Sequence, residues 1–197
     1  MSPQDVITEA RYPLNDTDST EYRQSDAELL IYVNAGMKEI STIRPDLFLT
    51  IGDYTCIQSQ CEQVITFQDA QRLVMPICIH GGAALTRFDI STIDTFLPQW
   101  RAATPAAATQ WAQYQGDPLR FFIYPPSPAS VQVLDIQYIK LPTALLIGDT
   151  ITEIPANMAP ALTDYVVFRA SSKDDEHSDS GRAVASYGAF VAKIKGT

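Results

Sequence analysis

The densest cluster of reactive side chains lies near the C-terminus, in the sequence ASSKDDEHSDSGRA at residues 170–183. Carboxylates and an imidazole, which could bind a metal ion or act as general bases, come from Asp174, Asp175, Glu176, His177 and Asp179. Ser180-Gly181 could belong to the nucleophile turn of a serine hydrolase. That turn requires a strained strand-to-helix elbow, whereas Ser180 begins a stretch with helical periodicity. We therefore interpret the cluster as a junction between two helices, in which Ser178, Asp179 or Ser180 caps the second.

A second candidate site is a structural zinc site. Its potential ligands are Cys56, Cys61, Cys78 and His80. Cys78 and His80 are two residues apart on a predicted strand, so their side chains would face the same way. However, four residues separate Cys56 from Cys61, and no matching close pair with a knuckle turn is present. The sequence favours reduced, buried thiols and no cofactor or metal, and it leaves a small zinc-binding or hydrolytic protein as an alternative.

Composition and charge exclude several functional classes. The net charge of −9 opposes a broad nucleic-acid interface, because phosphate binding needs clustered Lys and Arg. An acidic surface can still line a passage through which DNA slides without binding. No apolar run is long enough to span a membrane, and the start of the chain lacks a signal peptide, so we expect folding in the cytoplasm. No P-loop, dinucleotide glycine motif or G-x-S-x-G elbow indicates an enzyme.

Helical periodicity marks the N-terminal part of the chain. We expect a helix over residues 3–14 and a second helix that begins at a capping box formed by Ser25 and Glu28. This second helix should end at Arg44-Pro45, because the residue before a proline avoids helical geometry. Its predicted apolar face, at steps of three and four residues, is Leu30, Val33, Met37 and Ile40.

Two further helices are expected after Pro155. Asn157 or a neighbour should cap the first, which carries Leu162, Tyr165, Val166, Arg169 and Ala170. The final helix carries Val184, Tyr187, Val191 and Ile194 at helical spacing. We expect Arg169 to form an ion pair with Asp26 or Glu28. If Val184 lies in the core, Val184→Asp should strongly destabilise the helix, whereas Asp175→Ala should change little.

The middle of the chain is rich in β-branched and aromatic residues between turn formers. Strands are predicted within residues 47–58, 63–68, 72–80, 119–125 and 130–140. In the last of these, alternation places Leu134, Ile136 and Tyr138 on one face. A short helix over 90–103 should lie across the sheet, and 103–118 should be a loop. The fold class is therefore α+β, with the helices at 1–46 and 155–197 packed together as a bundle and a β-rich insertion at 47–154 that stands apart.

Two stretches together resemble the head-to-tail adaptor proteins of short-tailed bacteriophages. The first is RYPLNDTDSTEYRQSDAELLIYVNAGMKEISTIRPDLF at 11–48, and the second is ALTDYVVFRASSKDDEHSDSGRAVASYGAFVAKI at 161–194. FFIYPPSP, followed by a strand, is also similar to the family. The order and spacing of these motifs carry the resemblance, which is close at both ends and loose in the middle.

The resemblance implies a virion component without enzymatic activity at the neck between head and tail. Such adaptors form a ring, commonly dodecameric, beneath the portal protein, with the β-rich part directed to neighbouring components. The implied partners are the portal, further tail or nozzle proteins, other copies of the chain, and DNA that passes through the channel without specific binding; no membrane is implied. A tail or host-surface binding module built on the β insertion is a further alternative.

Overall fold

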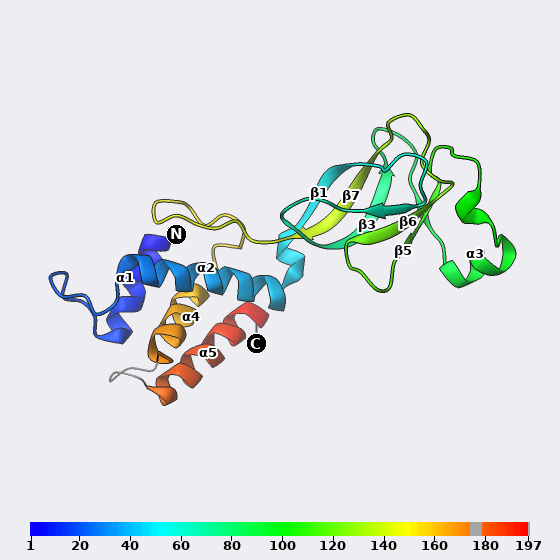
Figure 1. The fold of residues 1–197 in the computed structure, drawn as a ribbon. Helices are drawn as coiled ribbons and strands as arrows, with labels where there is room; N and C mark the ends of the chain where they lie inside the picture. Colours follow the sequence, from blue (N-terminus) through cyan, green and yellow to red (C-terminus); the bar gives the residue numbers. More distant parts are fainter. Residues whose placement is uncertain (174–178, 197) are drawn as a thin grey trace. The chain divides into compact units, whose positions relative to one another are not determined.

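The computed structural model describes residues 1–173 and 179–196 and shows two compact units. The helical unit comprises residues 1–48 and 142–197, and the β unit comprises residues 49–141 (Figure 1). Helices at both ends of the chain and a strand-rich middle confirm the predicted α+β class. Within the described residues, no helix is both long and apolar enough to cross a membrane.

The second boundary between the units lies before Pro142, thirteen residues earlier than the predicted one at 154/155. Leu145 is bound at both backbone groups by Asn34, which accepts from its N–H at 2.7 Å and donates to its carbonyl at 3.1 Å. Ile151 N–H donates to the Met1 carbonyl at 3.1 Å. These bonds attach residues 142–154 to the helical unit. The segment has neither helical nor strand periodicity, so its attachment could not be predicted from the sequence.

Four α-helices build the described part of the helical unit. They are α1 (Pro3–Leu14), α2 (Asp26–Ile43), α4 (Ala159–Ser171) and α5 (Ser180–Lys195), with a 3-10 turn, η1, at Pro45–Phe48. The bounds of α1 agree with the prediction, and α2 ends before Arg44 as expected. Ser25 caps α2 by accepting from Glu28 N–H at 3.2 Å, which is one half of the predicted capping box. The N-cap of α4 is Met158, not Asn157, without a side-chain hydrogen bond.

The helices from the two ends of the chain pack on one another, with α4 in contact with α1, α2 and α5 (Figure 1). Fully or nearly fully buried side chains form the core: Val6, Ile7, Ala10, Leu29, Val33, Met37, Ile40, Leu162, Tyr165, Val166, Phe190 and Ile194. At Gly36, α2 lies close against side chains of α4. A Cβ atom at Gly36 would lie 2.9 Å from Leu162 Cδ2 and 3.1 Å from Tyr165 Cδ1, so the contact requires glycine.

Two predicted helix faces were partly wrong: on α2, Val33, Met37 and Ile40 are buried as predicted but the first member of the face differs, and on α5 half of the face differs. Leu29, not Leu30, is in the core, and Leu30 is only partly buried. On α5, Val184 is 74% exposed, whereas Ala183 and Phe190 are buried. The buried face runs through residues 183, 187, 190 and 194. It shares residues 187 and 194 with the predicted face. Its first residue, Ala183, is small, so it gave little hydrophobic signal in the sequence. Tyr187 and Val191 are partly buried at its edge.

The predicted ion pair of Arg169 was also wrong, because other cations occupy its expected partners. Asp26 Oδ1 lies 2.5 Å from Arg11 Nη2, and Glu28 Oε1 lies 2.9 Å from Lys173 Nζ. The exposed Arg169 guanidinium lies 5.5 Å from the centroid of the Tyr32 ring, at the range of a cation–π contact. Its role is therefore a stacking contact between α4 and α2.

Two sheets build the β unit. A three-stranded antiparallel sheet has the order β1-β7-β3, formed by β1 (Leu49–Thr55), β7 (Val133–Lys140) and β3 (Ala70–Ile79). The second sheet has the order β2-β6-β5-β4, formed by β2 (Glu62–Val64), β6 (Arg120–Tyr124), β5 (Gln110–Gln113) and β4 (Thr86–Arg87). The predicted strands are confirmed, but the predicted loop at 103–118 contains the short β5, whose four residues are too few to show a period.

The core of the β unit lies on the face of β7 that the alternation predicted. Leu134, Ile136 and Tyr138 are buried there against Phe121 and Ile123 of β6. A smaller cluster lies where the predicted short helix, α3 (Ile90–Phe96), and the following turn η2 (Trp100–Ala102) cover β5 and β6. Its members are Ile93, Trp100, Ala112, Phe122 and Cys61.

We expect opposite effects from the same substitution at two helical glycines. Gly36→Ala should lower the free energy of unfolding by about 1–3 kcal/mol, because its methyl group overlaps Leu162 and Tyr165. Gly188→Ala, in the interior of α5 with no atom within 4 Å of the new Cβ, should raise it by about 0.5–1 kcal/mol. Urea unfolding followed by helical circular dichroism measures both. Stabilisation by Gly36→Ala would contradict the packing of α2 on α4.

The register of α5 is tested by two substitutions. Phe190→Ala should cost about 3–5 kcal/mol because the side chain is fully buried. Val184→Asp should change stability by no more than about 0.5 kcal/mol in the unassembled chain, because the side chain is already exposed to water. Thermal unfolding of the two variants compares them directly, and equal losses would contradict this register. The matching expectation for Asp175→Ala concerns a residue outside the described part of the chain.

Candidate functional site

A buried arginine organises the loop between α1 and α2. Arg11 is 4% exposed, and its Nη1 lies 2.6 Å from Asp16 Oδ2, itself a buried carboxylate. Its Nη2 donates to the Gln24 carbonyl at 3.0 Å and pairs with Asp26 at the start of α2. The Tyr22 ring covers the guanidinium at 3.5 Å. One side chain of α1 therefore fixes the beginning and end of the loop at 15–25.

Sequence analysis did not single out Arg11, although the stretch that carries the family resemblance begins with it. A charged residue on an apolar helix face is a signal that a partner is present, because a buried arginine needs compensating acids. Asp16 and Asp26 also supply those acids within the same stretch. The two aspartates pair with Arg11 because the loop folds back toward α1 in the tertiary structure. Local periodicity does not reveal this.

The described part of the C-terminal cluster is a helix junction. Asp179 caps α5 by accepting from Arg182 N–H at 2.9 Å, and its own N–H donates to the Ser171 carbonyl at 3.0 Å. Arg182 Nη1 donates to the Pro13 carbonyl at 2.9 Å, which connects the junction to the end of α1. The cap at Asp179 confirms that part of the interpretation. The four residues Asp174, Asp175, Glu176 and His177 lie outside the described residues.

The loop and the junction meet at a polar hollow of about 680 Å³. Its lining comes from both: Leu14, Asn15, Asp16, Glu21, Arg23, Asp179, Ser180 and Arg182. The two sequence stretches that resemble the adaptor family are therefore adjacent in space. Their polar side chains make structural bonds to backbone groups and to one another, as the bonds of Asp179 and Arg182 show.

The alternative zinc set of three cysteines and His80, which the sequence did not favour, is not brought together. Cys56 and Cys61 lie in two different hydrophobic clusters. Burial raises the pKa of the Cys56 thiol to about 12 and that of the Cys61 thiol to about 11, so both remain protonated and inert at neutral pH. The zinc site with this composition is therefore wrong.

Cys78 and His80 instead lie beside two carboxylates on the three-stranded sheet. His80 Nδ1 is 2.7 Å from Asp135 Oδ1 and 3.6 Å from Asp53 Oδ1. Cys78 Sγ is 3.3 Å from Asp135 Oδ2. The hydrogen bond from His80, and then that from Cys78, lowers the pKa of Asp135. Neither aspartate was singled out from the sequence, because their approach depends on strand register.

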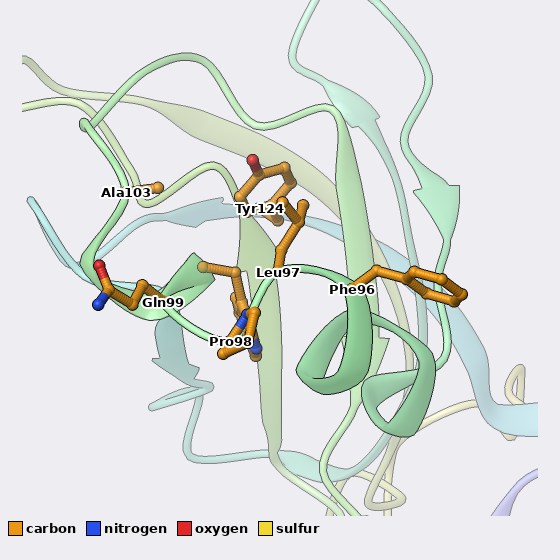
Figure 2. Close-up of a pocket in the computed structure, with 7 residues that line it drawn as sticks. Phe96, Leu97, Pro98, Gln99, Ala103 and Tyr124 are labelled. Atoms are coloured by element: carbon orange, nitrogen blue, oxygen red, sulfur yellow. The ribbon is translucent and has the colours of Figure 1, made fainter.

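An apolar hollow of about 410 Å³ lies beside α3 in the β unit. Figure 2 shows Leu97 lying against Tyr124, while Phe96 projects away from Tyr124. Phe96 is 77% exposed, and Leu97 is also exposed. Trp100 beneath them is buried and donates from its indole Nε1 to Asp94 Oδ1 at 2.7 Å. Aromatic side chains therefore form the floor of the hollow, and two exposed apolar side chains lie at its rim.

A comparison with protein families identifies the chain. The model of the family described as SU10 adaptor protein matches residues 1–196. The chain belongs to this family. The match extends through both units of the adaptor and confirms the resemblance to phage head-to-tail adaptors, a family with a structural, non-enzymatic role. No curated protein matches the sequence.

Loss of the buried arginine of this adaptor should be far more costly than loss of an exposed one. Arg11→Ala leaves the buried Asp16 carboxylate without its cation and should lower stability by about 3–5 kcal/mol. Arg182→Ala is the comparison, because its partly exposed pair with Asp179 and its exposed hydrogen bond to the Pro13 carbonyl should together contribute no more than about 1–2 kcal/mol. Chemical unfolding of the two variants gives the difference. Comparable losses would contradict the organising role of Arg11.

Proposed function

We propose that this adaptor assembles as an oligomeric ring beneath the portal at the neck of a phage virion, extends the DNA channel and docks tail components. The observation that supports the proposal is the family match across residues 1–196, which spans both the helical unit and the β unit. The function is mechanical: the protein acts through its surfaces and through the stability of its two units.

Exposed apolar side chains support assembly through both units. On the helical unit, Ile31 of α2 and Val184 of α5 are 65% and 74% exposed, and Leu146 is also exposed. On the β unit, Phe96 and Leu97 form the rim of the apolar hollow. Such side chains lose contact with water when a neighbour covers them, and each large one contributes about 1.5–3 kcal/mol when fully buried. We assign ring contacts to the helical unit and contacts with neighbouring components to the β unit.

The charge of the chain supports passage of DNA without retention. Each copy carries a formal net charge of −9, so a ring of copies presents a strongly negative field to phosphate groups. Specific DNA binding requires clustered cations, which release counterions from the phosphates. An acidic ring around the channel would therefore repel the DNA backbone from its wall and keep the genome mobile during its movement from the head.

Electron microscopy of the purified adaptor mixed with its cognate portal tests this function. We expect rings, twelve-fold if the usual symmetry of such adaptors holds, seated on one face of the portal. The proposal would be overturned if the adaptor stayed monomeric at concentrations higher than those used for virion assembly and also added no density to the portal.

Surface variants test the assignment of ring contacts. The double variant Ile31→Asp/Val184→Asp should keep its fold by circular dichroism, because both side chains are exposed, and should lose the ring. Phe96→Ser in the β unit is the matched control, and it should leave the ring intact. Rings formed by the double variant with wild-type yield would contradict the assignment of these contacts to the helical unit.

A further inference from the structure

The register of the three-stranded sheet aligns side chains of different chemistry on one face. β7 lies between β1 and β3, and Asp135 of β7 is opposite Asp53 on one side and Cys78 on the other. His80 follows β3, and its backbone N–H donates to the Val133 carbonyl at 2.9 Å, which holds it beside β7. Each of three chain segments therefore brings at least one potential metal ligand to the same place.

The ligand atoms of Asp53, His80 and Asp135 are close enough to share one ion, and Cys78 lies beside this group. The ligand atoms of Asp53, His80 and Asp135 all lie within 4.8 Å of one another, and Cys78 Sγ is 3.3 Å from Asp135 Oδ2. Ligands bound tetrahedrally to zinc at about 2.0–2.3 Å are separated by roughly 3.3–3.8 Å. Asp53 and His80 are more than half exposed, so their side chains can adjust by rotation without displacing the core.

The composition and charge of this set select a particular class of cation. Asp53 and Asp135 are directly opposite each other on neighbouring strands, an arrangement in which two like charges repel. A divalent cation between them would remove that repulsion. An imidazole nitrogen and a thiol beside two carboxylates favour zinc over magnesium or calcium, which prefer oxygen ligands alone.

We propose that Asp53, Cys78, His80 and Asp135 bind one zinc ion on the outer face of the three-stranded sheet. His80 coordinates through Nδ1 and Cys78 through its thiolate, and the Cys78 proton is released to solvent when zinc binds. The ion joins β1, β7 and the end of β3 at one end of the sheet and thereby stabilises the β unit. This site is independent of the proposed ring, so its failure would leave the adaptor function unaffected.

The proton competes with zinc for the same ligands. The hydrogen bond and negative charge of Asp135 raise the pKa of His80, and the same carboxylate raises the pKa of the Cys78 thiol. Cys56 and Cys61 offer no alternative thiolate, because both are buried in hydrophobic clusters.

Titration of the metal-free full-length adaptor with zinc, followed by calorimetry and thermal unfolding, tests the site. We expect one equivalent to bind and the melting temperature of the β unit to rise, because a ligand that binds only the native state stabilises it. Cobalt titration should give a thiolate-to-metal charge-transfer band in the near ultraviolet. Failure to bind one equivalent of either metal at micromolar concentration would overturn the proposal.

Variants at the exposed ligands identify the site. Loss of an outer-sphere partner alone typically weakens metal binding about 10–100-fold, so His80→Ala and Asp135→Asn should each weaken it at least tenfold. Cys78→Ser should abolish the cobalt charge-transfer band. His177→Ala, the same change at the other histidine, is the control and should bind as the wild type does. Unchanged binding in the His80 and Cys78 variants, or its loss in the control, would show an adventitious ion only and overturn the assignment.

Discussion

The close contact of α2 with α4 at Gly36 is the constraint on which the rest of the helical unit depends. The two helices come from opposite ends of the chain, and they approach so closely that a Cβ atom at Gly36 would overlap Leu162. This contact buries Val33, Met37 and Tyr165 and brings the two chain ends into one core. The β unit can therefore be an insertion with its own hydrophobic core.

Polar bonds then fix the irregular segments that the helical core cannot position. Arg11 holds the loop between α1 and α2, and Arg182 connects the junction before α5 to the end of α1. These bonds place both family-like stretches at one hollow. The residues that carry the family resemblance thus belong to the internal framework of the unit. We propose that contacts with other proteins depend instead on exposed apolar side chains such as Val184 and Phe96.

The sequence predicted those features that have a local period or a local cap. The α1 bounds, the Ser25 cap and the buried face of β7 follow from spacing alone. The buried face of α5 does not follow from spacing alone. An apolar face with helical spacing can begin at either Ala183 or Val184, and only the packing of α5 against α4 shows that it begins at Ala183. The strand β5 and the segment at 142–154 also lack a period, and their places depend on distant partners such as Asn34. Of the Asp53–His80–Asp135 cluster, only His80 could be singled out from the sequence, since strand register brings in the aspartates.

We propose that this adaptor is a structural protein of the neck, and its position in the assembled particle tests this most directly. Cryo-electron microscopy of virions labelled with an antibody fragment against the β unit would locate it. The account predicts a ring of label between the portal and the tail, with density in the helical unit that fits four packed helices. Label at the tail tip, or a complete absence of the chain from purified virions, would contradict it.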